Sequence, residues 1–448
     1  MQSGDFGERL ITVAGLLRVQ LPPEMVVTEP SAIAALIRLW NAQVMARPSV
    51  VARCRTTADV QAAVRAARSA GMPLSVLGGG HDWSGSAVRD GGLLVDISTM
   101  RQVTVEGAEA RVAGGATVSD VLDAARPHGH AAAVGTVSSV GFAGLTLGGG
   151  YGTLIGVAGL GVDNLLSAEV VLADGRVVTA DPQHEPDLFW ALRGGGGNFG
   201  VVTELRTRLH PFATVTSGTI AFGWDQARSV LLGWRKVMAS ADDALDVMFG
   251  AMHTPAGLVL YTTPAWAGDP GDAARQIAQI RALGAPVLDD VDRRALADTV
   301  HALDDMFPHG GNYHLGSQIV PPLTDDVIDA FVRSAEAMPA TCVLNVHHSH
   351  GAATRVPVTE TAYAYRDEHL VVEIIGAWFD GDGAAESAWV QDAERRLGRH
   401  ALPGGWANLL ARGDQRARNA YGINTSRLLA VKSHYDPDGV FTAIPLPD

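Results

Sequence analysis

The chain has 448 residues, of which 47% are hydrophobic and 18% are charged, and this composition excludes wholesale disorder. At about 100–200 residues per domain, its length predicts two domains or three. Asp and Glu total 48 against 34 Lys and Arg, and the net charge of −14 disfavours nucleic acid and anionic membranes as partners.

Cysteine content and hydropathy bear on where the protein is located. Cys54 and Cys342 are too few for a disulfide framework, so we expect a cytoplasmic protein. The first residues lack a basic segment followed by an apolar run, so we expect no signal peptide. No stretch reaches about 18 uninterrupted apolar residues, so we expect no membrane span.

The first half of the chain alternates short strands with helices. Residues 50–54 resemble a strand, after which Thr57 can cap a helix that Gly71 ends. Asp174-Gly175 is typical of a hairpin turn. We predict further strands at 74–77, 93–97, 103–105, 110–112, 168–172, 177–179 and 201–209, and further helices at 118–125 and 187–192.

The pattern changes near Pro211, where we place a domain boundary. Residues 212–405 have fewer glycine clusters and alternate longer helices with strands, including a helix at 322–338 and a strand at 371–378. The last stretch, 419–448, is compact and rich in motifs again. There is no internal repeat and no low-complexity linker.

Glycine is the informative residue: the chain has 51 copies, and dense runs of them mark three loops at 78–86, 135–152 and 193–200. These loops are not a P-loop, because neither Lys236 nor Lys432 lies in a glycine run. They are not a Rossmann fingerprint either, because a strand rather than a helix follows the first loop. Converging glycine loops can hold a diphosphate through main-chain N–H groups without any cationic side chain.

His81 ends the first glycine run at the tip of a strand, where its ring can meet a buried ligand. Metal ligation is the rival chemistry, but Asp82 is the only adjacent ligand-type residue, so we assign no metal site. Clustered histidines at 347, 348 and 350 leave a metal hydrolase as a second alternative.

Several motifs, in order, resemble the FAD-linked oxidases of the vanillyl-alcohol-oxidase superfamily, in the branch of berberine bridge enzymes and 6-hydroxy-D-nicotine oxidase. They run from about residue 50 to residue 441. The matching segments are 55–60, 77–85, 147–152, 193–203, 420–428 and 431–441.

The resemblance implies an α+β fold with a two-part FAD-binding domain of the PCMH type. A substrate domain, built on a large antiparallel sheet covered by helices, is inserted at 212–405. Residues 1–211 would form the FAD-binding domain, and 406–448 would return to it. It also implies a covalent 8α-histidyl FAD at His81, and a single link, because Val137 stands where some relatives have a second, cysteinyl attachment.

Carried over residue by residue, the resemblance predicts a FAD site on the glycine loops and the C-terminal motif. Its members would be Leu77, Gly78, Gly79, Gly80, His81, Ser86, Gly135, Thr136, Ser139, Gly141, Gly144, Tyr151, Gly152, Gly200, Val202 and Asn424.

The implied reaction is hydride transfer from a small, aromatic or polycyclic alcohol or amine to the flavin, with reoxidation by O2. Such a step needs a base for the O–H or N–H proton. The family's glutamate base aligns loosely near Arg355, so the base is open. Candidate catalytic residues are Tyr313, His348, His350 and Tyr421, with Tyr363, Tyr365 and Glu373 as further candidates, and Trp378, Phe379 and Trp406 as candidate pocket walls.

Two further functions fit the same motifs. One is a flavin-dependent oxygenating or tailoring enzyme of secondary metabolism. The other, of a different class, is a non-redox flavin-containing binding protein. The expected partners are a small-molecule substrate and O2, and the sequence leaves the oligomeric state open.

Overall fold

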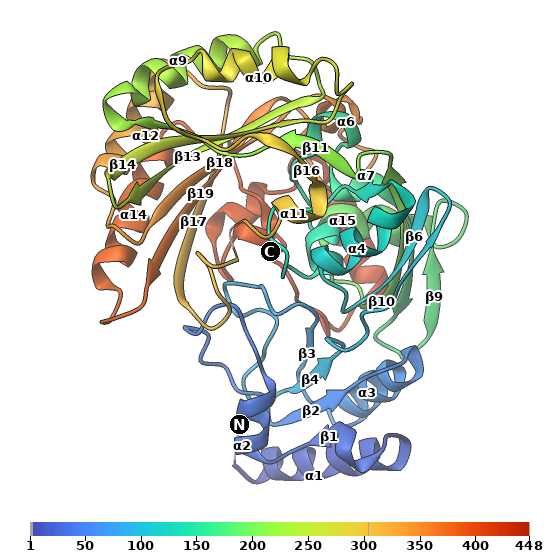
Figure 1. The fold of residues 1–448 in the computed structure, drawn as a ribbon. Helices are drawn as coiled ribbons and strands as arrows, with labels where there is room; N and C mark the ends of the chain where they lie inside the picture. The colour runs from blue at the N-terminus through green and yellow to red at the C-terminus, as the bar shows by residue number, and fades with distance from the viewer. Residues whose placement is uncertain (1–2, 303, 448) are drawn as a thin grey trace.

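A computed structural model describes residues 3–302 and 304–447 of the chain. These residues form three β-sheets: two smaller ones in the N-terminal half and a large antiparallel one in the second half (Figure 1). Mixed α and β structure with a large helix-covered antiparallel sheet confirms the predicted fold class. No helix of the described residues is both long and apolar enough to cross a membrane.

The first sheet is small and mostly parallel, in the order β1-β2-β4-β3. The Thr56 side chain accepts a hydrogen bond from the backbone N–H of Asp59, and the Asp59 side chain accepts one from the backbone N–H of Thr56. This capping box makes Thr56 the N-cap of the helix that crosses from β2 to β3, one residue before the predicted Thr57. The elements are α1 (Ser3–Gln20), β1 (Val26–Val27), α2 (Pro30–Leu36), β2 (Val50–Arg53), α3 (Thr57–Ser69), β3 (Leu74–Leu77) and β4 (Leu93–Asp96).

The second sheet is antiparallel, in the order β5-β6-β10-β8-β9, with β7 paired to the end of β10. The predicted hairpin turn joins β8 to β9, and Gly175 there has a φ of 79°, which glycine adopts without strain. Its strands are β5 (Val103–Glu106), β6 (Glu109–Ala113), β7 (Ala131–Ala132), β8 (Leu165–Val171), β9 (Val177–Ala180) and β10 (Val201–His210), and its helices are α4 (Val118–Ala125), α5 (Phe142–Leu147), α6 (Ile155–Ala158), α7 (Gly161–Asn164) and α8 (Pro186–Gly195).

The large sheet begins after Pro211 and runs β15-β12-β14-β13-β18-β19-β17, with β11 and β16 paired beside β14. Its strands are β11 (Thr214–Ser217), β12 (Ile220–Gly223), β13 (Leu245–Thr254), β14 (Gly257–Trp266), β15 (Pro286–Asp289), β16 (Asp292–Ala295), β17 (Asn312–Val320), β18 (Val343–Ser349) and β19 (His369–Trp378). Its helices are α9 (Ala227–Met238), α10 (Ala273–Arg281), α11 (Leu296–Thr299), α12 (Asp325–Glu336), α13 (Ala352–Arg355) and α14 (Ala384–Gly398).

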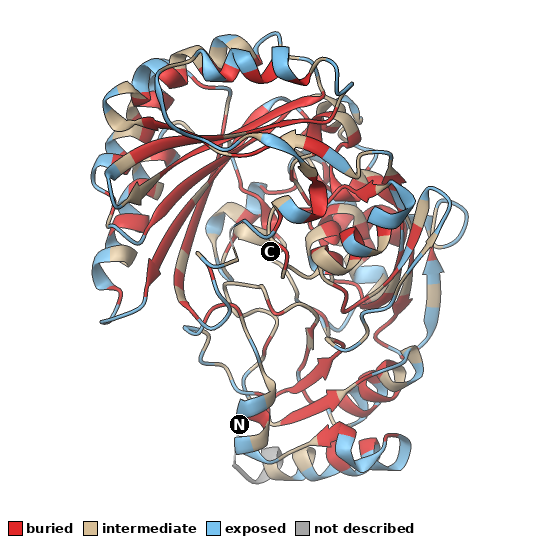
Figure 2. Cartoon of the chain, viewed as in Figure 1, coloured by how far each residue is buried: buried red, intermediate tan, exposed pale blue. Residues whose placement is uncertain are grey.

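Residues alternate between the two faces of the large sheet, as the period of a strand requires. One face packs Leu344, Val346 and Phe249 against α9, α10, α12 and α14, forming an apolar layer on the outer side (Figures 1 and 2). The opposite face turns toward the glycine loops of the first half. This second face is therefore where strand residues can meet a ligand held by those loops.

The end of the chain returns to the first half. Helix α15 (Thr425–Tyr435) packs against α8, and the Lys432 ammonium donates to the carbonyl oxygens of Asn198 and Phe441. The Asn198 side chain in turn binds the backbone of Ala443 and Ile444. These contacts fix the third glycine loop. The sheets change between β10 and β11, which is compatible with a boundary near 211, and the division at 211 and 405 stays a prediction.

Candidate functional site

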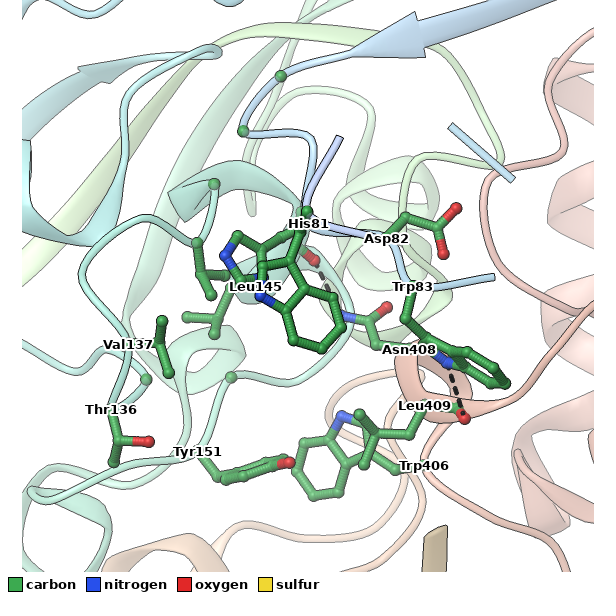
Figure 3. A pocket seen from close by; sticks show the side chains of 18 of the residues that line it. His81, Asp82, Trp83, Thr136, Val137, Leu145, Tyr151, Trp406, Asn408 and Leu409 are labelled. Carbon is green, nitrogen blue, oxygen red and sulfur yellow. Dashed lines mark hydrogen bonds between the residues drawn. The ribbon is translucent and has the colours of Figure 1, made fainter. Parts of the chain in front are cut away.

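A cavity of about 570 Å³ lies between the glycine loops and the inner face of the large sheet, and residues of all three predicted loops line it. Figure 3 shows the side formed by the first two loops and residues 406–409. That volume suits a cofactor or drug-sized ligand. The predicted cofactor residues that line it are Gly78, Gly79, Gly80, His81, Ser86, Gly135, Thr136, Gly141, Gly144, Tyr151, Gly200 and Val202.

His81 lines the cavity as a tightly held, neutral imidazole. Its Nε2 lies 2.9 Å from the Ser139 hydroxyl oxygen, its ring stacks on Trp40 at 5.2 Å, and His309 meets it edge-on at 5.0 Å. Burial, with a smaller effect of His309, lowers the pKa of His81 to about 3. The ring is therefore uncharged at neutral pH and has a nitrogen lone pair available for bonding.

The first two glycine loops cross with their backbones in contact. A Cβ on Gly79 would lie 2.4 Å from the backbone nitrogen of Gly141, and one on Gly152 would lie 2.0 Å from the carbonyl oxygen of Val134. A Cβ on Gly144, which lines the cavity, would meet nothing within 4 Å. Glycine is therefore required at Gly79 for the crossing of the two loops and at Gly152 for the close approach of the two ends of the second loop, and at Gly144 it leaves room for a ligand.

The charge of the lining fits an anionic cofactor held by main-chain groups. Among the described residues that line the cavity, none is lysine or arginine, and the carboxylates belong to Asp82, Asp246 and Glu373. A diphosphate in this cavity must be bound by backbone N–H groups and hydroxyls, as the glycine loops predict. The residues present therefore fit FAD, a flat ring system joined to a diphosphate.

The segment after residue 405 closes a third side of the cavity. Trp406, Asn408 and Leu409 line it, and the Asn408 amide donates to the carbonyl oxygen of Gly144 at 3.0 Å (Figure 3). The Trp83 indole N–H donates to the carbonyl oxygen of Leu409 at 3.3 Å, which joins this segment to the His81 loop. Of the three predicted aromatic walls, Trp406 alone lines the cavity.

A buried polar cluster occupies the sheet side of the cavity. The Tyr151 hydroxyl donates to Glu373 Oε1 at 2.5 Å, and the Asn345 amide donates to Glu373 Oε2 at 2.8 Å and to His347 Nε2 at 2.9 Å. The Tyr261 hydroxyl donates to Asn345 Oδ1 at 3.1 Å, which fixes the orientation of that amide. All five side chains line the cavity.

Electrostatics within the cluster keep the proton on Tyr151 and off Glu373. Burial alone would raise the pKa of Glu373, but His347 and the hydrogen bonds from Tyr151 and Asn345 outweigh it, so this pKa lies below its usual value. Burial and the neighbouring Glu373 carboxylate raise the pKa of Tyr151 far above its usual range. The pair is thus an ionised carboxylate that accepts a hydrogen bond from a neutral phenol.

Of the candidate catalytic residues named from the sequence, Glu373 lines the cavity, whereas the lining does not include Tyr313, His348, His350, Tyr363, Tyr365 or Tyr421. His348 lies on the opposite face of β18 from His347, so its ring packs beside Trp234 in the helix layer. Its Nε2 atom lies 2.7 Å from Glu368 Oε1. His350 follows the end of β18 and lies 3.5 Å from Asp246. The three histidines at 347, 348 and 350 do not converge on one point.

Both tyrosine candidates donate to main-chain oxygens. The Tyr313 hydroxyl donates to the carbonyl oxygen of Pro308, and its ring stacks on Trp40 at 3.9 Å, one layer behind the cavity wall. The Tyr421 hydroxyl donates to the carbonyl oxygen of Pro445, within the apolar core of the first half, and Tyr421 does not line the cavity. Neither hydroxyl faces the cavity, so we do not carry these four residues into a mechanism.

The remaining predicted cofactor residues support the cavity without lining it. Asn424 donates to the carbonyl oxygens of Val358 and Thr361 and so braces a loop. Leu77 packs into an apolar cluster, Gly152 lies against Val134 at the start of its own loop, and Ser139 contacts His81. Their role is to hold the lining residues in place.

The position that aligns with the family's glutamate base, Arg355, does not line the cavity. Arg355 is exposed and pairs with Asp243, far from any role in proton transfer. Asn345 and Tyr261 were not foreseeable as site residues from the sequence, because only their strand parity brings them to the cavity. The polar residues between 345 and 350 were the available signal, and of these Asn345 and His347 line the cavity.

Comparisons with known proteins agree with this site. A model described as FAD binding domain matches residues 48–181, and one described as berberine and berberine like matches residues 395–444. The uncharacterized FAD-linked oxidoreductase YgaK of Bacillus subtilis is 28% identical over 410 residues, which is 88% of this chain and 90% of that protein.

A curated relative and a solved structure are both described as 6-hydroxynicotine oxidases. The (R)-6-hydroxynicotine oxidase of Paenarthrobacter nicotinovorans is 35% identical over 288 residues, 62% of each chain. The crystal structure of 6-hydroxy-D-nicotine oxidase from Arthrobacter nicotinovorans superposes with a TM-score of 0.85 and 27% identity, covering 94% of this chain and 97% of that one.

Proposed function

Since the chain belongs to the FAD-linked oxidoreductases related to berberine bridge enzymes, we propose that it oxidises a small, largely apolar alcohol or amine, with O2 as the final electron acceptor. The substrate would lie between the flavin and the inner face of the large sheet. Tyr151 and Glu373 would accept its proton, and His81 would hold the flavin covalently. The single link follows from Val137, which lines the cavity in place of a cysteine, while Cys54 and Cys342 lie in separate apolar cores.

The cofactor would occupy the glycine-lined half of the cavity. His81 would hold the ring end, and the loops around Gly79, Gly141 and Gly200 would bind the diphosphate through backbone N–H groups. When bound, FAD supplies an acceptor for two electrons and a hydride. Gly144 leaves space for it, because any side chain there would enter the same volume.

The hydrogen bond from Tyr151 to Glu373 carries the proposal. Tyr151 comes from the second glycine loop and Glu373 from the middle of β19, so this bond joins the cofactor side of the cavity to the substrate side. Glu373 is already bound by Asn345 at its other oxygen. The phenol oxygen of Tyr151 is therefore the atom with free acceptor capacity toward a substrate.

The proton path follows from these contacts. As the substrate C–H bond breaks, its O–H or N–H proton passes to the Tyr151 oxygen, and the Tyr151 proton moves to Glu373. Asn345 and His347 hold the carboxylate in place and favour its ionised form before the step. Trp406 and Tyr261 exclude water from the sides of the cavity.

Substrate screening with the purified full chain tests this function. Aromatic alcohols and primary or secondary amines with apolar bodies are added without oxygen, and bleaching of the bound flavin is followed by visible absorbance. A substrate that bleaches it, and that forms peroxide in air, supports the proposal. A protein purified with FAD available that remains colourless contradicts it.

A further inference from the structure

One contact of His81 is not explained by cofactor binding alone. Ser139 does not line the cavity, and its hydroxyl makes one hydrogen bond among the described contacts, to the imidazole Nε2 of His81 at 2.9 Å. The two residues are fixed relative to each other, because Gly79 and Gly141, each two positions away, cross in backbone contact. The crossing of the first two loops therefore brings a hydroxyl to one chosen nitrogen of the histidine.

The other ring nitrogen remains open. Nδ1 of His81 has no hydrogen bond among the described residues, and it is absent from their fully buried unpartnered atoms, so it keeps accessible surface in the cavity. Trp40 holds the ring face at 5.2 Å and His309 holds its edge at 5.0 Å. Trp40 is itself fixed, because its indole N–H donates to the carbonyl oxygen of Phe307 at 3.0 Å.

We propose that Ser139 is a positioning residue for flavin attachment: by accepting the Nε2–H of His81, it selects the tautomer whose Nδ1 lone pair faces the cavity. The hydrogen bond at one imidazole nitrogen sets which nitrogen carries the proton. The proposal rests on the covalent link at His81 proposed above. It adds the residue that prepares the histidine for the reaction.

The step balances with O2 as the oxidant. A bond forms between Nδ1 and the 8α carbon, while one C–H bond of the 8α methyl group and the Nε2–H bond break. The two electrons and two protons released reduce the flavin ring, and O2 takes both to give H2O2. Ser139 accepts a hydrogen bond from Nε2–H and so stabilises the positive charge that develops on the imidazole as Nδ1 bonds to carbon; the Nε2 proton then leaves to solvent.

The experiment measures attachment separately from turnover. The full chain is produced in riboflavin-limited cells, incubated with excess FAD in air, and sampled for flavin that stays with the protein after acid precipitation. Ser139→Thr and Ser139→Val form a matched pair that differs in the hydroxyl group alone. Ser138→Ala is the control, because the neighbouring Ser138 hydroxyl donates to Asp304 rather than to His81.

Ser139→Ala and Ser139→Val should attach flavin about 10-fold more slowly than the unmodified chain, as expected for loss of one orienting hydrogen bond. Ser139→Thr and Ser138→Ala should remain within about 2-fold, on the scale of a retained bond. FAD affinity, measured in a His81→Ala background with and without Ser139→Ala, should be unchanged. The linkage should be at Nδ1 in the unmodified chain, and at both nitrogens in Ser139→Ala.

Three results would overturn these claims, at different levels. Attachment in Ser139→Val as fast as in Ser139→Thr, with no acid-stable flavin in His81→Ala, overturns the role of Ser139 and leaves the attachment site standing. Acid-stable flavin in His81→Ala overturns the attachment site, and the role of Ser139 with it. Equal slowing in Ser138→Ala and Ser139→Ala also contradicts the proposal, because it would show a general effect of the loop.

Discussion

Replacing Glu373 by Gln tests the proton path at the atom where it ends. Gln keeps the volume of the side chain and one oxygen for the Tyr151 hydroxyl, but it cannot take up the proton. Its amide would also face the Asn345 amide, a second donor, at the position where Oε2 now accepts at 2.8 Å. The variant should therefore fold and bind flavin, and should fail mainly in chemistry.

The magnitude follows from the role assigned to the carboxylate. Loss of a positioned general base costs about 10²- to 10⁴-fold in rate, or about 3–5 kcal/mol of transition-state stabilisation. If Asn345 turns its oxygen toward the new amide, the buried Tyr261 hydroxyl loses its shorter hydrogen bond and keeps only the carbonyl oxygen of Leu344 at 3.4 Å, at a cost of about 1 kcal/mol in stability. Catalysis should thus fall far more than stability.

The assay is the rate of flavin bleaching by substrate in the absence of oxygen, with thermal unfolding measured in parallel. Glu368→Gln is the matched control, because that carboxylate binds His348 on the helix side of the sheet and does not line the cavity. It should bleach at close to the rate of the unmodified chain. A Glu373→Gln protein that bleaches within about 3-fold of that rate, well below the cost of a lost base, would refute the reasoning.

Three further predictions concern the same cavity. Tyr151→Phe removes the hydroxyl that passes the proton to Glu373. It should slow anaerobic bleaching of the flavin by about 10- to 100-fold, the lower part of the range for proton-transfer groups, and leave the flavin content unchanged. A bleaching rate equal to that of the unmodified chain would show that the substrate reaches Glu373 directly. Gly144→Leu should lose most of its bound flavin, measured by absorbance, because the new side chain enters the cavity, while the Tm of the flavin-free chain should stay the same. Full flavin content would contradict the assignment of this space to the cofactor. Glu373 must be ionised to accept a proton and its pKa lies below the ordinary 4.5, so kcat should fall with acid only below that pH; an acidic limb well above it, with an uncharged substrate, would assign the base elsewhere.

The cofactor side of the cavity could be predicted from sequence because its signals are local. A strand that runs directly into Gly78-Gly79-Gly80 must turn there, and a histidine at its end stands at the edge of the sheet. The helix after β2 shows the same precision at its start: Thr56 and Asp59 have the spacing of a capping box, although Thr57 is the neighbouring alternative. Spacing over three or four residues is enough in both cases.

The substrate side could not be predicted, because it depends on which face of β18 turns inward. Polar residues occupy both parities of that strand, with Asn345 and His347 on one and His348 on the other. Packing against α9 decides between them, since Leu344 and Val346 belong to the helix layer and carry His348 with them. The face of β18 that turns inward is therefore set by tertiary packing, and no short-range sequence pattern predicts it.

The most direct measurement is the mass of the proteolytic peptide that contains His81, taken from purified holoprotein after acid precipitation. A cavity that holds FAD at the His81 nitrogen predicts that this peptide carries the whole dinucleotide. An unmodified His81 peptide from a yellow protein, or a flavin found on any other residue, would contradict the arrangement.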